Sequence, residues 1–190
     1  MSSNETPDAK EEELVREAAA QLRERVAEAH QTVQEALQEF PVRPHRPTAT
    51  QIADFMGGHE ALASPVRSMM DLHEVVQSGI PNQALFHLAD ALAVPLPVFA
   101  KALAISETKL YIIEGRDDSL DAAVGDRLCR VAYLGVLATQ VFSDQAAAGR
   151  WLIEAQHGLG DRIPLDLTAT YAGTQEAEAL LMRLRHSFYA

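Results

Sequence analysis

The sequence is short of cysteine, of basic residues and of long hydrophobic runs, and each shortage excludes a class of protein. One cysteine in 190 residues excludes an internal disulfide and any zinc site built from several cysteines. No apolar run reaches the roughly 18–20 residues that cross a bilayer. The first residues, MSSNETPDAKEEE, are too polar and acidic for a secretory signal. We therefore expect a soluble, cytoplasmic protein with no membrane partner.

The shortage of basic residues limits binding to nucleic acids. The formal net charge is -11 at pH 7, so bulk charge does not attract polyphosphates and any DNA contact requires a local patch.

Enzymatic motifs are missing as well. The seven histidines are scattered, and the chain has neither a phosphate-binding glycine loop nor a nucleophile elbow. We expect no enzyme, no catalytic residues, no metal and no cofactor.

Helical periodicity is abundant and strand-type alternation is missing, which predicts an all-α protein. Residues 11–40 contain no glycine or proline, and their apolar residues recur at steps of three and four. This pattern predicts an N-terminal helix that either packs lightly on its own domain or pairs with a second copy in a dimer. The proline-rich PVRPHRP at 41–47 then predicts a stiff, extended linker.

From residue 47 the sequence predicts short helices joined by tight turns. The expected N-caps of four of these helices are Thr50, Asn82, Ser119 and Ser143, and Pro65 fits the first turn of another. Cys129 lies in an apolar helical pattern and is read as a small core residue. We expect three regions: the acidic helix and linker at 1–46, a helix-turn-helix domain at 47–132, and a second helical domain at 133–190.

The segment LPVFAKALAISETKLYIIEG has the apolar spacing of a helix-turn-helix. Large apolar residues fall where the two helices must touch: Phe99, Leu103, Ile105, Leu110 and Ile113. Ala100 is small where the helices cross. Ala104 stands at the turn position that usually holds glycine, because the backbone there has a positive φ. A residue other than glycine costs on the order of 1 kcal/mol in that conformation.

The second helix of this segment has little of the chemistry that reads DNA. Its expected outward residues are Ser106, Glu107, Thr108, Tyr111 and Ile112. None is arginine, lysine, asparagine or glutamine, which make the best bidentate contacts with bases. Three cations and two anions leave residues 96–116 with a net charge of only plus one. DNA reading and a scaffold or dimer role fit these residues equally well. The candidate DNA contacts are Lys101, Ser106, Thr108, Lys109, Tyr111 and Arg116.

Three features of the C-terminal half are distinctive. A Ser-Asp helix cap at 143–144 is followed by RWL at Trp151, the loop LGDRIPLDL occupies 159–167, and a last helix ends close to Phe188 and Tyr189. With the helix-turn-helix ahead of them, residues 68–190 resemble the Xre/MbcA/ParS-type antitoxins, the partners of RES-domain toxins. Two departures from that family are Asp161, where a second glycine is usual, and a terminus without the usual Glu-Tyr-Gly.

The resemblance implies a non-catalytic antitoxin. Such a protein binds an NAD⁺-degrading RES-domain toxin with its C-terminal domain and covers the toxin's active-site entrance with its last residues. It also represses its own operon by binding operator DNA, as a homodimer or within a larger toxin–antitoxin assembly. Two other interpretations of the whole chain stay open: a stand-alone helix-turn-helix transcriptional regulator, and an oligomeric adaptor that does not bind DNA.

The last helix supports the resemblance independently. An apolar face is formed by Ala177, Leu180, Leu181, Leu184 and Phe188, so Arg183, Arg185 and His186 are expected to lie off it. A basic, aromatic chain end suits a pocket that binds a polyphosphate cofactor, although arginines in a last helical turn also simply complement the helix dipole. For Trp151, core packing is the first interpretation and partner contact the second. The expected toxin-binding residues are Trp151, Arg183, Arg185, His186, Phe188, Tyr189 and Ala190.

Overall fold

A computed structural model of the chain describes residues 19–23, 25, 26, 28, 46–114, 116 and 118–188. The chain divides into two compact units, residues 1–43 and 44–190. In the first unit the described residues are helical, and Leu22 and Val26 are exposed. This agrees with the helix predicted for that region, most of which lies outside the described residues.

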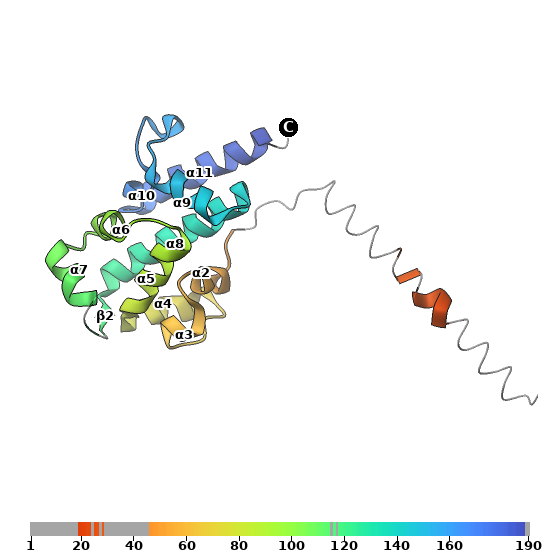
Figure 1. Cartoon of the computed structure of the whole chain (residues 1–190), viewed down its shortest axis with the longest axis horizontal. Helices are drawn as coiled ribbons and strands as arrows, with labels where there is room; N and C mark the ends of the chain where they lie inside the picture. Colours follow the sequence, from red (N-terminus) through yellow and green to blue (C-terminus); the bar gives the residue numbers. More distant parts are fainter. Residues whose placement is uncertain are drawn as a thin grey trace, which may run out of the picture. The chain divides into compact units, whose positions relative to one another are not determined.

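The second unit is built almost wholly from helices (Figure 1). They are α2 (Ala49–Phe55), α3 (Gly58–Leu62), α4 (Met69–Ser78), α5 (Asn82–Ala91), α6 (Leu96–Ala102), α7 (Glu107–Glu114), α8 (Ala122–Phe142), α9 (Gln145–Ile153), α10 (Pro164–Leu167) and α11 (Tyr171–Phe188), with the 3₁₀ helix η1 (His157–Leu159). Two-residue strands β1 (Ile80–Pro81) and β2 (Ser119–Leu120) pair antiparallel. The all-α prediction is confirmed.

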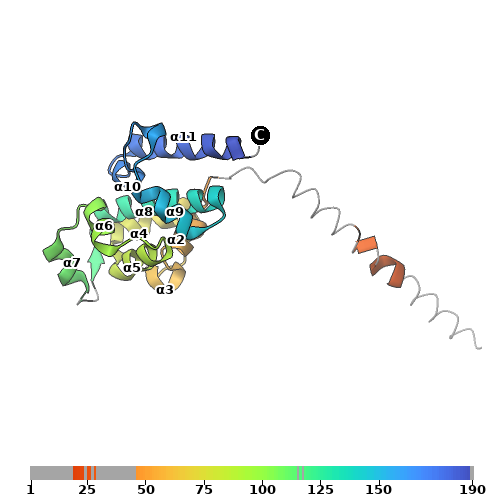
Figure 2. The same cartoon turned by 45° about the horizontal axis from the view of Figure 1, so that its top comes forward.

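Helix α8 is the centre of this unit. It packs against α2, α4, α9 and α11, and Figure 2 shows it between the earlier helices and α11. Burial on several sides requires apolar residues around most of its circumference, and Val131, Leu134, Leu137 and Ala138 are all fully buried. The helix is continuous over 21 residues. It therefore passes through residues 132 and 133, where two domains were expected to meet.

The earlier and later helices also share a close backbone contact. A Cβ placed on Gly149, in α9, would lie 1.7 Å from the carbonyl oxygen of Leu92, at the end of α5. Only glycine leaves room for this approach. On the other side, the Arg130 guanidinium of α8 donates its Nε hydrogen to the carbonyl of Thr168, at 2.8 Å. These two contacts fix α9 and the α10–α11 connection to the rest of the unit.

Two helices begin at residues other than the predicted ones. Thr48, not Thr50, caps α2: its backbone is extended and its hydroxyl accepts the N–H of Gln51 at 3.2 Å. Ser68, not Pro65, marks the start of α4. Side-chain capping needs an extended backbone just before the first turn. Thr50 already lies inside α2, where its hydroxyl donates to the carbonyl of residue 66.

Two further N-cap predictions were wrong. Asn82 begins α5 without capping it. Its side chain is buried and donates to the carbonyl of Arg116 at 3.3 Å. Ser119 lies in β2, and α8 is capped by Asp121, whose carboxylate accepts the N–H of Val124 at 3.0 Å. A carboxylate has the stronger interaction with the positive end of a helix.

In the described part of the chain, no single helix is long and apolar enough to cross a membrane. The α5–α6 pair passes that test only jointly and is bent by 118°.

Candidate functional site

The connection between α9 and α11 closes on itself. The N–H of Gln156 donates to the carbonyl of Arg162 at 3.0 Å, which makes an antiparallel bridge across the loop. At the tip, Gly160 and Asp161 have φ values of 66° and 59°. Aspartate tolerates this left-handed conformation better than most residues. The turn is thus retained where Asp161 replaces the second glycine that the sequence resemblance led us to expect.

The start of α9 differs slightly from prediction. Asp144, not Ser143, is its N-cap, and the Asp144 carboxylate accepts the N–H groups of Ala146 and Ala147, both at 3.1 Å. Ser143 has a φ of 55° and ends α8. The sharp change of direction between α8 and α9 therefore depends on a left-handed serine followed by a carboxylate cap.

Trp151 belongs to the core of this region. Its side chain is 6% exposed, and its ring lies 6.3 Å from that of Phe142 at an angle of 43°. The buried indole Nε1 has no hydrogen-bond partner among the described residues. The Trp151 carbonyl accepts the side-chain amide of Gln156 at 3.1 Å, which joins α9 to the closed loop. The burial agrees with the first interpretation, core packing.

Helix α11 carries its apolar residues on the predicted face. Ala177, Leu180 and Leu181 are buried, and Leu184 is partly buried. Arg183 is exposed, as predicted. The expectation that Arg185 lies off the apolar face is wrong, because its side chain is only 8% exposed. Arg185 follows Ala177 and Leu181 at steps of four, and residues at that spacing return to the same side of a helix.

The end of the chain is described only in part. The backbone of α11 is helical as far as Phe188, but the side chains of His186 and Phe188 lie outside the described part of the structure, and so do Tyr189 and Ala190 altogether. The proposed contacts of these four residues with a partner therefore stay predictions. Arg183 is the described member of the predicted binding set that lies on the surface.

A polar cluster that the sequence analysis did not single out joins α11 to α8. Glu178 is buried, and its carboxylate accepts the Gln175 amide at 3.0 Å and lies 3.6 Å from the Arg46 guanidinium. Burial, and next the hydrogen bond with Glu178, raise the pKa of the Tyr133 hydroxyl. No sequence motif marks these residues, because they come from three distant segments. Their hydrogen bonds satisfy a carboxylate that would otherwise be costly to bury.

The burial predicted for the α6–α7 segment is confirmed. The five large apolar residues at the helix contact are all buried: Phe99, Leu103, Ile105, Leu110 and Ile113. Ala100 is 2% exposed, and Ala104 has a φ of 58°. The turn therefore contains an alanine in a left-handed conformation, as its position in the sequence predicted.

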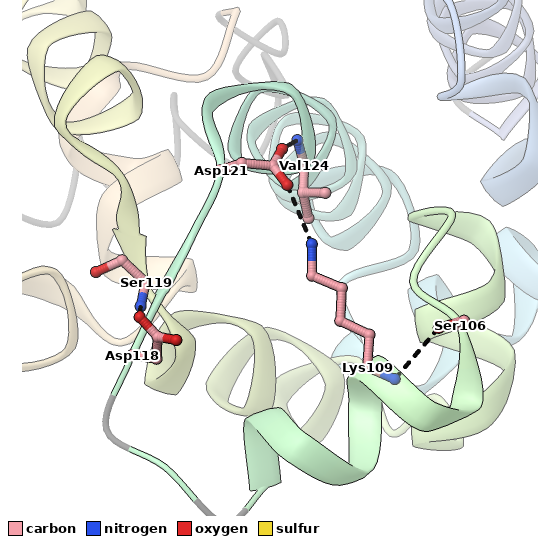
Figure 3. A network of polar contacts seen from close by, with 6 residues as sticks. All are labelled: Ser106, Lys109, Asp118, Ser119, Asp121 and Val124. Atoms are coloured by element: carbon pink, nitrogen blue, oxygen red, sulfur yellow. Dashed lines mark hydrogen bonds and ion pairs between the residues drawn. The ribbon is translucent and has the colours of Figure 1, made fainter.

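Polar groups on α7 are engaged in local bonds (Figure 3). The Ser106 hydroxyl accepts the N–H of Lys109 at 3.2 Å and so caps the helix. The Lys109 ammonium lies 3.1 Å from the carboxylate of Asp121, which also caps α8. The bond from the Val124 N–H, and next that from Lys109, lower the pKa of Asp121. The sequence analysis missed this partner of Lys109, which comes from another element.

The other candidate DNA contacts lie on the surface. Lys101, Thr108 and Arg116 are exposed, and so are Tyr111 and Ile112, whose exposed fractions are 79% and 45%. The α6–α7 surface therefore combines two exposed cations, Lys101 and Arg116, with two exposed apolar side chains, Tyr111 and Ile112. This mixture fits phosphate contacts and protein contacts alike.

The described residues provide no metal centre. No group of three or more histidine, cysteine, aspartate or glutamate side chains is positioned to hold an ion within that part of the chain. Cys129 is half-buried against the core, and burial raises the pKa of its thiol to about 12. The thiol therefore stays protonated at neutral pH, and a protonated thiol is a poor nucleophile and metal ligand.

Comparison with known proteins decides the family of the C-terminal region. Residues 137–186 match the family described as the antitoxin Xre/MbcA/ParS C-terminal toxin-binding domain. The chain carries an Xre/MbcA/ParS-type antitoxin domain. A curated relative, an "Antitoxin Xre" of Pseudomonas putida, is 29% identical over 73 residues, which are 38% of this chain and 46% of the relative. The chain thus spans under half of that relative's length.

The matched residues can be located on the structure, and they are called the Xre/MbcA/ParS domain below. The match begins at Leu137, in the second half of α8, and covers α9, the closed loop, α10 and α11 as far as residue 186. Trp151, Arg183 and Arg185 all belong to it. The α6–α7 segment lies outside it.

Proposed function

We propose that the protein is an antitoxin that binds and inactivates a toxin through its Xre/MbcA/ParS domain. One observation carries the proposal: the residues that match a toxin-binding family coincide with the continuous structural region from the end of α8 through α11. The toxin that we propose is an NAD⁺-degrading RES-domain enzyme of the cytoplasm. Its active-site entrance would be covered by the C-terminal segment of the antitoxin.

The structure supports different roles for the predicted binding residues. Arg183 is exposed on α11, which supports a role in direct contact with the toxin. A guanidinium at the mouth of a site for a diphosphate cofactor would complement its charge. Arg185 and Trp151 are buried, so we assign them the role of holding α11 and α9 in place. His186, Phe188, Tyr189 and Ala190 would then form the covering segment.

The test is co-expression with the RES-domain toxin that this proposal expects to be encoded beside the gene, with growth and cellular NAD⁺ as readouts. A chain that ends at Arg185 removes the covering segment and keeps the buried arginine. We expect this variant to retain the complex but to lose protection of the cells. The full-length Arg183→Ala variant is the matched control, because it removes one proposed toxin contact and keeps the covering segment. Full protection and unchanged NAD⁺ with the shortened chain would contradict occlusion by the C-terminal segment.

A second candidate function, repression of its own operon, is favoured by the geometry of α6 and α7. The two helices bury the contacts expected for a DNA-binding pair, and Lys101, Thr108, Tyr111 and Arg116 are exposed beside them. Because one copy offers few cations, we propose that binding requires a dimer or a larger toxin–antitoxin assembly, in which several copies share one duplex.

Fluorescence anisotropy with the DNA upstream of the gene tests this second function. The measurement is made with and without toxin over a range of salt concentrations. Each phosphate contact adds about 0.9 to the slope of log affinity against log salt. We expect a clear slope that steepens when the toxin assembles several copies. A slope near zero in both conditions would contradict operator binding.

A further inference from the structure

Large apolar side chains that are exposed gather at two places in residues 46–188. Val98, Tyr111 and Ile112 lie on α6 and α7, while Met69 and Met70 open α4 and Tyr171 opens α11. Isolated exposed apolar residues need no explanation, but a cluster around a concave surface marks an interaction site. The second group has such a surface beside it.

Met69 and Tyr171 line one groove of about 770 Å³. Helices α4 and α11 form its walls, and α8 supplies residues between them. Leu72 and Val76 contribute from α4, and Cys129 and Tyr133 from α8. Apolar groups therefore dominate the interior, and two flexible or aromatic side chains stand at its edge. Methionine adapts to partners of varied shape, so this edge suits a helical partner segment with apolar anchors.

The charge of the groove differs from that of the whole chain. Two arginines and one aspartate line it: Arg46, Arg130 and Asp126. The chain as a whole has a net charge of -11, whereas each arginine of the groove is balanced by a carboxylate. Arg130 pairs with Asp126 and also donates to Thr168, and Arg46 lies beside Glu178. The groove is therefore close to electrically neutral, and its apolar lining determines which partner surface it can bind.

We propose that this groove receives an amphipathic helix of the toxin, with its apolar face against Met69, Val76 and Tyr171. The inference rests on the proposed antitoxin function and adds a docking surface separate from the C-terminal segment. Its occupant follows from continuity with the toxin-binding family match, because Tyr171, which forms one edge of the groove, lies within residues 137–186.

The chain offers a matched pair of variants for the test. Tyr171 and Tyr111 are both helical and have exposed fractions of 73% and 79%, so replacing either by alanine should leave the fold intact. By calorimetric titration with the RES-domain toxin of the proposed function, we expect Tyr171→Ala to raise the Kd by about 30-fold, as for an aromatic hot-spot residue. Tyr111→Ala should change the Kd less than about twofold. A photo-crosslinking amino acid at 171, and not at 111, should capture the toxin.

The outcomes separate this inference from the proposed function. If the wild-type chain fails to bind the toxin, both the antitoxin function and the docking role of the groove are contradicted. If the wild-type chain binds and Tyr171→Ala binds equally well, only the groove is overturned. Light scattering of the antitoxin alone provides another outcome: if Tyr171→Ala abolishes self-association without changing toxin affinity, a second copy occupies the groove and the inference is wrong. Thermal unfolding confirms that each variant is folded.

Discussion

The α6–α7 segment and the Xre/MbcA/ParS domain use the same kind of helical packing with different results. In the α6–α7 segment, Ser106 caps its own helix and Lys109 pairs with Asp121, so polar groups expected to face a partner are bonded locally. In the C-terminal domain, long-range contacts at Gly149 and Thr168 fix the backbone, and Arg183 stays on the surface. An apolar pattern therefore predicts which face is buried, but not whether the opposite face is available for binding.

The C-terminal domain depends on the close approach of α9 to the backbone of Leu92, which Gly149 makes possible. Gly149→Ala should break this contact. A Cβ at this position would lie 1.7 Å from the carbonyl oxygen of Leu92. Because this oxygen belongs to the backbone, the overlap can be relieved only if α9 moves. We expect the free energy of unfolding to fall by at least about 3 kcal/mol, measured by urea denaturation. Gly160→Ala is the control, because its Cβ would meet no atom within 4 Å and only its positive φ is penalised. Equal losses from both variants would contradict a packing role for Gly149.

The two arginines of α11 provide the next test. Arg185 is buried and Arg183 is exposed. We expect Arg185→Ala to lower stability by about 2–3 kcal/mol, because it removes packed stem atoms and the bonds of a buried cation. Arg183→Ala should change stability by less than about 0.5 kcal/mol but should weaken toxin binding. The thermal midpoint and the toxin Kd are measured for both. A larger stability loss at Arg183 would reverse these assignments.

Much of the fold could be predicted because local periodicity determines which helix face is buried. The contacts at Phe99 and Leu110, the alanine with positive φ at Ala104, and the apolar face of α11 at Leu181 all followed from spacing. The helix starts were predicted less well. Several polar residues stand near each start, and only the backbone conformation selects Thr48 or Asp121 as the cap.

The candidate site was harder to predict because it depends on contacts between distant segments. The Glu178 cluster joins residues from before α2, from α8 and from α11. The pair of Lys109 and Asp121 spans two helices. Arg185 was misplaced because charge suggested exposure, whereas its position in the helix repeat places it on the buried side. At this position the charge of the side chain predicted exposure and the helical repeat predicted burial, and the helical repeat was right.

The turn between α6 and α7 is predicted to be strained at Ala104. Relieving that strain should change stability less than the substitutions described above. Ala104 has a φ of 58°, and glycine adopts that conformation without a steric penalty. Ala104→Gly should therefore stabilise the protein by up to about 1 kcal/mol, reduced by the greater freedom of glycine in the unfolded chain. In a protein of this size the thermal midpoint should rise by about 2–4 °C. A lower midpoint would mean that the turn is not strained at this residue.

The smallest expected effect concerns the local bonding of Lys109. Asp121→Asn removes the charge that faces the ammonium but retains an N-cap for α8, since asparagine caps helices about as well as aspartate. If operator binding holds, the freed Lys109 should strengthen DNA binding by a few fold, because an exposed ion pair contributes at most about 1 kcal/mol, and should steepen the salt slope by about one. Asp118→Asn is the matched control: it removes the same charge, but its carboxylate accepts the Ser119 N–H. Equal gains from both variants would attribute the effect to net charge, and the α7 surface would then be limited by the acidity of the whole chain instead of by one ion pair.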